Sequence, residues 1–319
     1  MNIYTDLSEI DNIKNPVLTI GTYDGVHLGH QKILEFLKQK AKAIKGESVV
    51  FTFYPHPRMV LHPNDHHLEL LQTIDERIDK LSKIGIDHLI VFPFSKEFSR
   101  LSAVEFVRDV LVNQINIHTL VVGYDHQFGR NREGTKDVLK ELAPVYNFNV
   151  VEIPAFLKDE VKISSTKIRK ALKVGKVDVA KTYLGEYYSI QGVVVQGDKI
   201  GSTIDFPTAN IFVKEDYKLI PANGVYAVKV FINDCEFSGM LNIGERPTIS
   251  ESGEKRIEVH IFDFNKDIYQ QKIKVDFVKM IRKEKTFANL EELKQQLQID
   301  ENKCRTILDA HTLSANKKC

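Results

Sequence analysis

Two histidines at the start of a predicted helix are the residues best placed for chemistry in this chain. His27 and His30 lie three positions apart in the segment VLTIGTYDGVHLGH (17–30), so they share one face of a helix. Gly29 removes a side chain where a phosphate group would approach the backbone. Because the free N–H groups of a first helical turn attract anions, the pattern predicts a phosphate site with two proton-bearing side chains.

A metal site is the alternative interpretation of this histidine pair. Zinc would need further cysteine or histidine ligands. The other histidines that could contribute are scattered, at His56, His62, His66 and His67. The three cysteines are widely spaced, which argues against structural zinc or a disulfide framework and predicts reduced thiols at Cys235, Cys304 and Cys319. We therefore favour nucleotide binding over metal binding at the two histidines.

A buried strand and a sharp turn must position the histidines. The apolar run at 17–20 predicts the strand, Gly21 ends it, and Asp24 forms the turn together with Gly25. The helix that follows carries apolar side chains at helical spacing, at Ile33, Leu34, Leu37, Ala41 and Ile44. We therefore expect the histidines at the carboxyl end of a strand.

Strand and helix patterns alternate through the first half of the chain. Further apolar runs predict strands at 48–53, 87–94, 118–122 and 149–154. Capping boxes predict the starts of two helices, at Thr73–Glu76 and Ser102–Glu105. This alternation predicts an α/β domain whose parallel sheet is covered on both faces, with ligands at the carboxyl ends of the strands.

Two loops after these strands could contact a ligand. Pro55 and His56 follow the second strand, in a segment whose prolines forbid regular structure. Gly123, Asp125 and Phe128 follow a later strand, in a glycine-rich loop that suits a planar or phosphorylated ligand.

A third polar segment opens a helix. It contains the hydroxyl groups of Ser164, Ser165 and Thr166, with Arg169 one turn later. One hydroxyl is enough to cap the exposed N–H groups of the helix. Three hydroxyls together with Lys167 and the guanidinium exceed what a cap needs.

The pattern changes to strands with frequent turns after a short helix at 178–185. Strand candidates lie at 189–196, 224–232, 237–244, 256–264 and 272–281. With one late helix at 290–297, they predict a small closed antiparallel barrel. We expect two domains, residues 1–184 and 185–319.

The second domain contains a further chemical signature, Phe206 to Asn210. Thr208 and Asn210 lie two apart in an extended chain, so the hydroxyl and amide oxygens point the same way. That geometry suits a hard cation such as Mg²⁺ bridging phosphates. Glu258 lies in an alternating strand sequence in which the neighbouring apolar residues face the other side.

The motifs of the first half resemble the H-x-G-H signature of the nucleotidylyltransferase superfamily, and within it the N-terminal module of prokaryotic bifunctional riboflavin kinase/FAD synthetases. The resemblance implies a Rossmann-like sheet on which His27 and His30 contact ATP phosphates and stabilise charge at the α-phosphorus. Ser164, Ser165, Thr166 and Arg169 match an element that closes over the ATP phosphates. Pro55 and His56 match an element near the flavin nucleotide. The remaining cofactor-binding positions that it implies are Gly21, Tyr23, Asp24, Gly29, Gly123, Asp125 and Phe128.

The second half resembles the riboflavin kinase fold in four ordered motifs. They are G-D-x-x-G-x-x-x-x-F-P-T-A-N from Gly197, N-G-V-Y-A from Asn223, N-I-G-x-R-P-T at 242–248 and E-V-H-I-F from Glu258. The resemblance implies that Glu258 accepts the proton of the ribityl 5′-hydroxyl and that Thr208 and Asn210 hold Mg²⁺–ATP. It also assigns cofactor binding to Gly197, Gly201, Phe206, Asn223 and Arg246.

Together the motifs predict a bifunctional enzyme that converts riboflavin to FMN and FMN to FAD, with ATP as co-substrate and Mg²⁺ as cofactor. One alternative hypothesis is that only one half is active, because Asp205 stands where most members of the family have glycine. Another is a flavin-responsive binding or regulatory protein that keeps the pockets without turnover.

Composition restricts the partners. The net charge of +1 offers no general attraction to nucleic acid or anionic lipid, so a small phosphorylated ligand is preferred over a polymer. The N-terminus lacks a signal-peptide pattern and no run approaches a membrane span, which predicts a soluble, cytoplasmic protein without membrane or nucleic-acid partners. The oligomeric state stays open between a monomer and transient self-association.

Overall fold

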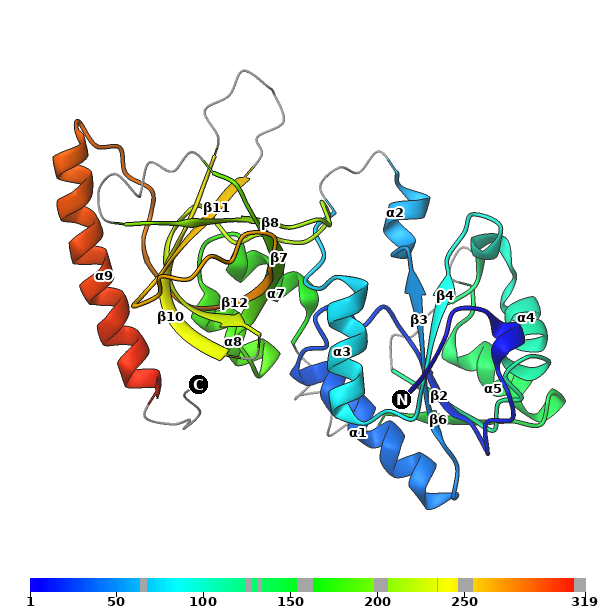
Figure 1. The fold of residues 1–319 in the computed structure, drawn as a ribbon. Coiled ribbons are helices and arrows are strands. Elements are labelled where there is room, and N and C mark those ends of the chain that lie inside the picture. The colour runs from blue at the N-terminus through cyan, green and yellow to red at the C-terminus, as the bar shows by residue number, and fades with distance from the viewer. Residues whose placement is uncertain are drawn as a thin grey trace. The chain divides into compact units, whose positions relative to one another are not determined.

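The computed structural model describes residues 1–63, 68–123, 128–130, 133–153, 163–197, 206–233, 235–245 and 255–312 (Figure 1). Its internal contacts divide the chain into two compact units, Met1–Ser165 and Thr166–Cys319. Each unit is described by itself below. The domain boundary after residue 184 stays a prediction. Among the helices of the described ranges, none is long and apolar enough to cross a membrane.

The first unit is built on a six-stranded sheet in which every pair of neighbouring strands is parallel. The strands are β1 (Asn2–Tyr4), β2 (Val17–Ile20), β3 (Ser48–Tyr54), β4 (His88–Pro93), β5 (Thr119–Val122) and β6 (Asn149–Glu152). Their order in the sheet is β1-β4-β3-β2-β5-β6. The helical segments are η1 (Leu7–Glu9), α1 (Leu28–Ala43), α2 (Pro57–Leu61), α3 (Ile74–Ile84), η2 (Phe98–Arg100), α4 (Ala103–Glu105), η3 (Phe106–Val112) and α5 (Lys136–Val145).

Helices cover both faces of this sheet, which confirms the predicted α/β class. Val49 and Phe51 of β3 pack in one apolar cluster with side chains of η3 and α5. Val50, between them, packs in a second cluster with side chains of α1 and α3. Since successive residues of a strand point to opposite faces, the two clusters lie on opposite sides of the sheet.

Local signals explain where the helices begin. Both predicted capping boxes are present, with Thr73 and Glu76 at α3 and with Ser102 and Glu105 at α4. The α4 helix is short, however, because the chain continues directly into the π-helical segment η3.

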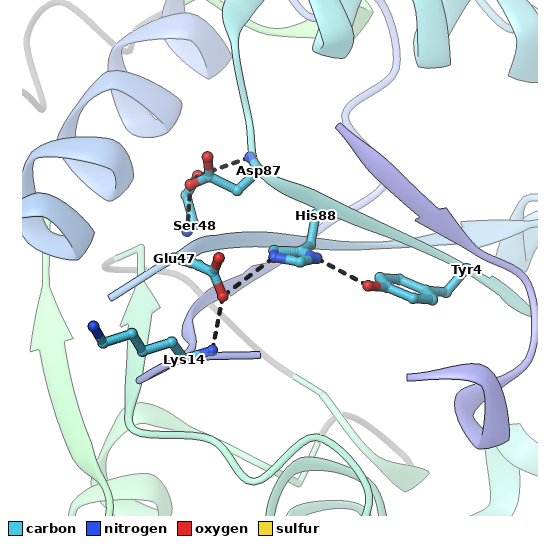
Figure 2. A network of polar contacts seen from close by, with 6 residues as sticks. All are labelled: Tyr4, Lys14, Glu47, Ser48, Asp87 and His88. Atoms are coloured by element: carbon cyan, nitrogen blue, oxygen red, sulfur yellow. Dashed lines mark hydrogen bonds and ion pairs between the residues drawn. The ribbon is translucent and has the colours of Figure 1, made fainter. Parts of the chain in front are cut away.

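A polar network joins Tyr4, the last residue of β1, to the amino ends of β3 and β4 (Figure 2). The buried His88 ring is hydrogen-bonded through Nδ1 to Tyr4 Oη at 3.1 Å and lies 3.5 Å from Glu47 Oε2 through Nε2. Beside it, Ser48 donates to the Asp87 carboxylate at 2.6 Å. The network therefore ties the short edge strand β1, which sequence analysis missed, to the sheet.

The second unit is a closed barrel of antiparallel strands, as predicted. The strands are β7 (Tyr188–Val195), β8 (Ala209–Phe212), β9 (Gly224–Ile232), β10 (Cys235–Glu245), β11 (Lys255–Ile261) and β12 (Lys272–Arg282), in the barrel order β10-β11-β8-β7-β12-β9. Helix α7 (Ser165–Leu172) begins at the last residue of the first unit, and α8 (Val177–Leu184) and α9 (Leu290–Thr312) follow along the chain.

Helix α9 packs on the barrel. Cys304 and Leu308 are buried in a cluster with apolar side chains of the barrel. The carboxylate of Asp300, which is fully buried, accepts a hydrogen bond from Arg282 Nε at 2.7 Å. Cys304 is a free thiol, whereas Cys235 is disulfide-bonded, so the expectation of a reduced thiol is wrong at Cys235.

Candidate active sites

Predicted site residues of the first unit lie where three adjacent strands end. Gly21 follows β2, Pro55 follows β3 and Gly123 follows β5. These strands are neighbours in the sheet, in the order β3-β2-β5. Parallel sheets bind ligands at this edge, outside the carboxyl ends of their strands.

His27 and His30 form a stacked pair at the start of α1. Their ring centroids lie 3.6 Å apart with an angle of 16° between the ring planes. His27 is the N-cap of the helix, and its Nδ1 accepts a hydrogen bond from the backbone N–H of His30 at 3.2 Å. Gly29 is buried in the first turn between them. The shared helical face predicted from their spacing is therefore present.

Burial keeps both imidazoles neutral near pH 7. His27 is 3% exposed, and burial lowers its pKa to about 4, helped by the charge of Lys80 and opposed by that of Asp24. Burial also lowers the pKa of His30 well below its usual value, and so does charge repulsion, because a proton on His30 would repel a proton on His27 and the charge of Lys80. Because Nδ1 of His27 accepts a hydrogen bond, its ring proton is on Nε2. His27 therefore offers a neutral N–H donor.

The turn before His27 is held by its own side chains. Tyr23 is buried, its hydroxyl is hydrogen-bonded to Thr19 Oγ1 at 2.9 Å, and burial raises its pKa. Asp24 is 1% exposed, and its carboxylate accepts hydrogen bonds from the backbone N–H groups of Leu71 at 2.9 Å and Gln72 at 3.2 Å. The structure thus gives Asp24 backbone partners within the protein, and its role in ligand binding stays a prediction. The N–H of Gly21 donates to Phe51 O at 3.0 Å.

The loop after β3 leads into a short helix. The Tyr54–Pro55 peptide bond is cis. His56 is buried and caps α2, where its Nδ1 accepts from the backbone N–H of Arg58 at 3.2 Å.

Further predicted residues lie in two other segments. Phe128 forms a β-bridge with Gly134 and packs against Phe106, with ring centroids 5.6 Å apart. Ser165 Oγ donates to the backbone carbonyl of Asp24 at 2.9 Å, so this hydroxyl contacts the histidine-bearing turn. Ser164 is half-buried; on α7, Thr166 is exposed and Arg169 is half-buried. Asp125 lies outside the described residues.

Asn210, one of the two predicted metal ligands, and Glu258, the predicted base, lie opposite each other on neighbouring strands of the second unit. Asn210 of β8 pairs with Glu258 of β11, and Thr208, which is exposed, lies just before β8. Gly197 follows β7, and a Cβ atom at this position would overlap the side-chain amide of Asn210. Glycine at 197 therefore leaves the room that the Asn210 amide occupies.

Arg256 joins these two side chains and was missed by sequence analysis. Its Nη2 lies 2.6 Å from Glu258 Oε1, and its Nε donates to Asn210 Oδ1 at 3.3 Å. The signal was available, since residues two apart in a strand share one face.

Two cavities adjoin this group in the second unit. The first, of about 330 Å³, has Glu258 and Thr208 in its wall together with apolar side chains, among them Phe206, Phe287 and Leu293. The second, of about 770 Å³, is lined by Gly197, Thr208 and Tyr269, among others. Thr208 therefore borders both cavities.

The other predicted residues of this unit differ in their placement. Phe206 is buried, with its ring centroid 5.3 Å from that of His260. Asn223 donates to Glu245 Oε1 at 3.3 Å and lines neither of the two cavities. Gly201 and Arg246, like Asp205, lie outside the described residues.

Both halves of the chain match known protein families. Residues 9–167 match the model of FAD synthetase, and residues 184–308 match that of riboflavin kinase. The bifunctional riboflavin kinase/FMN adenylyltransferase of Buchnera aphidicola subsp. Schizaphis graminum is 40% identical, over 91% of this chain and 95% of its own. The protein of the same name from Bacillus subtilis is 37% identical, over 89% and 90% of the two chains.

A solved structure shares the fold over nearly the whole chain. It is titled macrolide-efflux protein from Streptococcus pneumoniae, and it is 32% identical with a TM-score of 0.84, covering 95% of this chain and 98% of its own. Its printed name refers to efflux, whereas both family models and the curated relatives name flavin enzymes. On the strength of the two family models and these relatives, the chain belongs to the bifunctional riboflavin kinase/FMN adenylyltransferase family.

Proposed function

We propose that this chain carries out two successive transfers from ATP to a flavin. The second unit transfers the γ-phosphoryl group to the 5′-hydroxyl of riboflavin and releases FMN and ADP. The first unit joins the phosphate of FMN to the α-phosphorus of ATP and releases FAD and pyrophosphate. One observation carries the proposal: one family model covers the unit in which Gly21, Pro55 and Gly123 follow neighbouring parallel strands, and the other covers the barrel in which Asn210 pairs with Glu258.

For the kinase reaction, Glu258 is the proposed general base. The attacking hydroxyl must lose a proton as its oxygen bonds to the γ-phosphorus, and a carboxylate within hydrogen-bond reach can accept that proton. Glu258 lines the apolar cavity of about 330 Å³, whose aromatic and aliphatic walls suit a flat flavin ring. Arg256, 2.6 Å away, orients the carboxylate in the absence of substrate.

Thr208 and Asn210 would hold Mg²⁺ together with the phosphates of ATP. Their hydroxyl and amide oxygens are the neutral, hard ligands that Mg²⁺ accepts, and Gly197 leaves space for the amide. Bound there, the ion would offset the negative charge of the phosphates. The cavity of about 770 Å³ beside Gly197 and Thr208 is the proposed position of the nucleotide.

For the adenylyl transfer, His27 and His30 stabilise the charge that develops on the α-phosphate. Neutral imidazoles supply N–H donors, and the first turn of α1 supplies backbone N–H groups that favour an anion. No covalent bond to the enzyme is required, because the FMN phosphate itself attacks the phosphorus. Positioning and electrostatic stabilisation then account for catalysis.

The other roles in the adenylyl transfer rest on the family resemblance. Ser164, Ser165, Thr166 and Arg169 are the proposed partners of the β- and γ-phosphates, and Pro55 and His56 those of the flavin nucleotide. The cytoplasmic location likewise stays a prediction.

Incubation of the full-length protein with riboflavin, ATP and Mg²⁺, followed by chromatography, tests the proposal. We expect FMN and ADP first, and then FAD and pyrophosphate. If only one half is active, as the Asp205 hypothesis states, supplied FMN is converted to FAD while riboflavin is left unchanged. A flavin-responsive regulatory protein would bind the ligands and form neither product.

A further inference from the structure

The turn that carries the histidine pair has an unfavourable backbone conformation. Val26 has φ = 36° and Tyr23 has φ = 48°, both in the left-handed region. For a β-branched residue such as valine this region is a genuine outlier, and such strain persists only where the surrounding structure enforces it. Val26 is fully buried and immediately precedes His27, the N-cap of α1. Contacts with the surrounding structure must therefore hold residues 22–26 in this conformation.

Helix α3 contacts this turn directly through Lys80 and indirectly through Arg77. Lys80 Nζ donates to the carbonyl of Gly25 at 3.2 Å. Arg77 Nη1 donates to Thr52 Oγ1 at 3.2 Å, and that hydroxyl donates in turn to the carbonyl of Thr22 at 3.3 Å. These contacts fix the two ends of the turn.

The segment just before α3 fixes the middle of the turn. The backbone N–H groups of Leu71 and Gln72 donate to the carboxylate of Asp24. The capping box of Thr73 and Glu76 then starts the helix. We call Leu71, Gln72, Arg77 and Lys80 the α3 clamp.

The free energy of folding alone does not explain why the cations of Lys80 and Arg77 are buried in the α3 clamp. Lys80 is 8% exposed and Arg77 is 1% exposed. Removing such groups from water is costly, and well-packed apolar residues often serve stability equally well. An apolar residue at position 80 would be unable to donate to the Gly25 carbonyl. We therefore attribute the lysine to its contact with the turn that carries the histidine pair.

We infer that Lys80 is a positioning residue for the adenylyl transfer: through Gly25 it holds the strained turn that aligns His27 and His30. This inference rests on the proposed function of the first unit. It assigns Lys80 no contact with substrate. Loss of the contact lets residues 23–26 relax, so the stacked rings lose their common orientation toward one phosphate.

Kinetics of the full-length enzyme test the inference through Lys80→Met, which keeps a long side chain and removes the donor. We expect kcat for FAD formation from FMN to fall about 10- to 100-fold, as for a misplacement of about 1 Å, with a smaller change in KM for ATP. Lys80→Arg keeps a donor and a charge, and should restore most of the rate. Lys83→Met is the matched control, because Lys83 lies on the same helix with its side chain 74% exposed.

Hydrogen exchange supplies a readout independent of turnover. In Lys80→Met, the amides of Val26, His30 and Gln31, which donate within the turn and the first turn of α1, should exchange faster than in the wild type. Lys83→Met should leave them unchanged. The kinase rate of each variant reports whether the second unit is intact.

An unchanged kcat in Lys80→Met would overturn the inference. A higher KM for ATP with unchanged kcat and unchanged hydrogen exchange would also overturn it, because Lys80 would then contact the nucleotide itself. An equal loss of kinase activity would indicate general unfolding and would also count against it. If the wild type forms no FAD, the proposed function fails, whereas the exchange comparison still decides whether Lys80 holds the turn.

Discussion

Acidification should destabilise the first unit through His27. In the folded protein its pKa is about 4, against an ordinary value of 6.5. The unfolded chain therefore binds more protons between these two pH values, so stability is fully present above pH 6.5 and is lost as the pH falls toward 4. At about 1.4 kcal/mol for each pH unit of difference, the loss is about 3 kcal/mol. His27 is almost fully buried, so solvent screens little of this effect. His30 shifts in the same direction and adds to it.

The assay compares the wild type with His27→Asn, which keeps a side chain able to cap a helix but cannot titrate. Hydrogen exchange in increasing urea gives the free energy of unfolding from peptides of the first unit alone, which a two-unit chain requires. Between pH 7 and pH 4 the wild type should lose about 3 kcal/mol more than the variant. His62→Asn, at an exposed position, is the control and should behave as the wild type. Equal pH dependence in the wild type and His27→Asn would refute the reasoning.

Three further substitutions test other parts of the account. Gly197→Ala places a methyl group against the amide of Asn210. Steady-state kinetics should therefore show kinase activity reduced at least about tenfold, with FAD formation unchanged. Arg169→Ala should raise the apparent KM for ATP in FAD formation, and unchanged kinetics would contradict its proposed role. His88→Phe removes the two polar contacts drawn in Figure 2 and should cost about 1–3 kcal/mol in exchange-derived stability, with both kcat values retained.

Features that depend on residues close in sequence could be predicted. The shared helical face of His27 and His30 follows from their spacing at a helix start, and the capping box of Thr73 and Glu76 is local in the same way. The pairing of β8 with β11, which brings Asn210 opposite Glu258, was not predicted, because no local rule joins residues so far apart in the chain.

Features that depend on distant contacts were missed. Strand β1 has three residues and exists because it pairs with β4, far along the chain. Arg77 and Lys80 would ordinarily be expected on the solvent face of α3, because charged side chains are rarely buried. Only the packing of α3 against the histidine-bearing turn reveals that both are enclosed.

Two independent active sites in one chain are the central claim, and single-site variants test it most directly. Glu258→Gln should form FAD from supplied FMN but convert riboflavin at least about 100-fold more slowly, the contribution expected of a general base. His27→Asn should form FMN from riboflavin and accumulate it, with little FAD. Mixing the two variants should restore the conversion of riboflavin to FAD. Loss of both activities in either folded variant, or no recovery on mixing, would contradict the account.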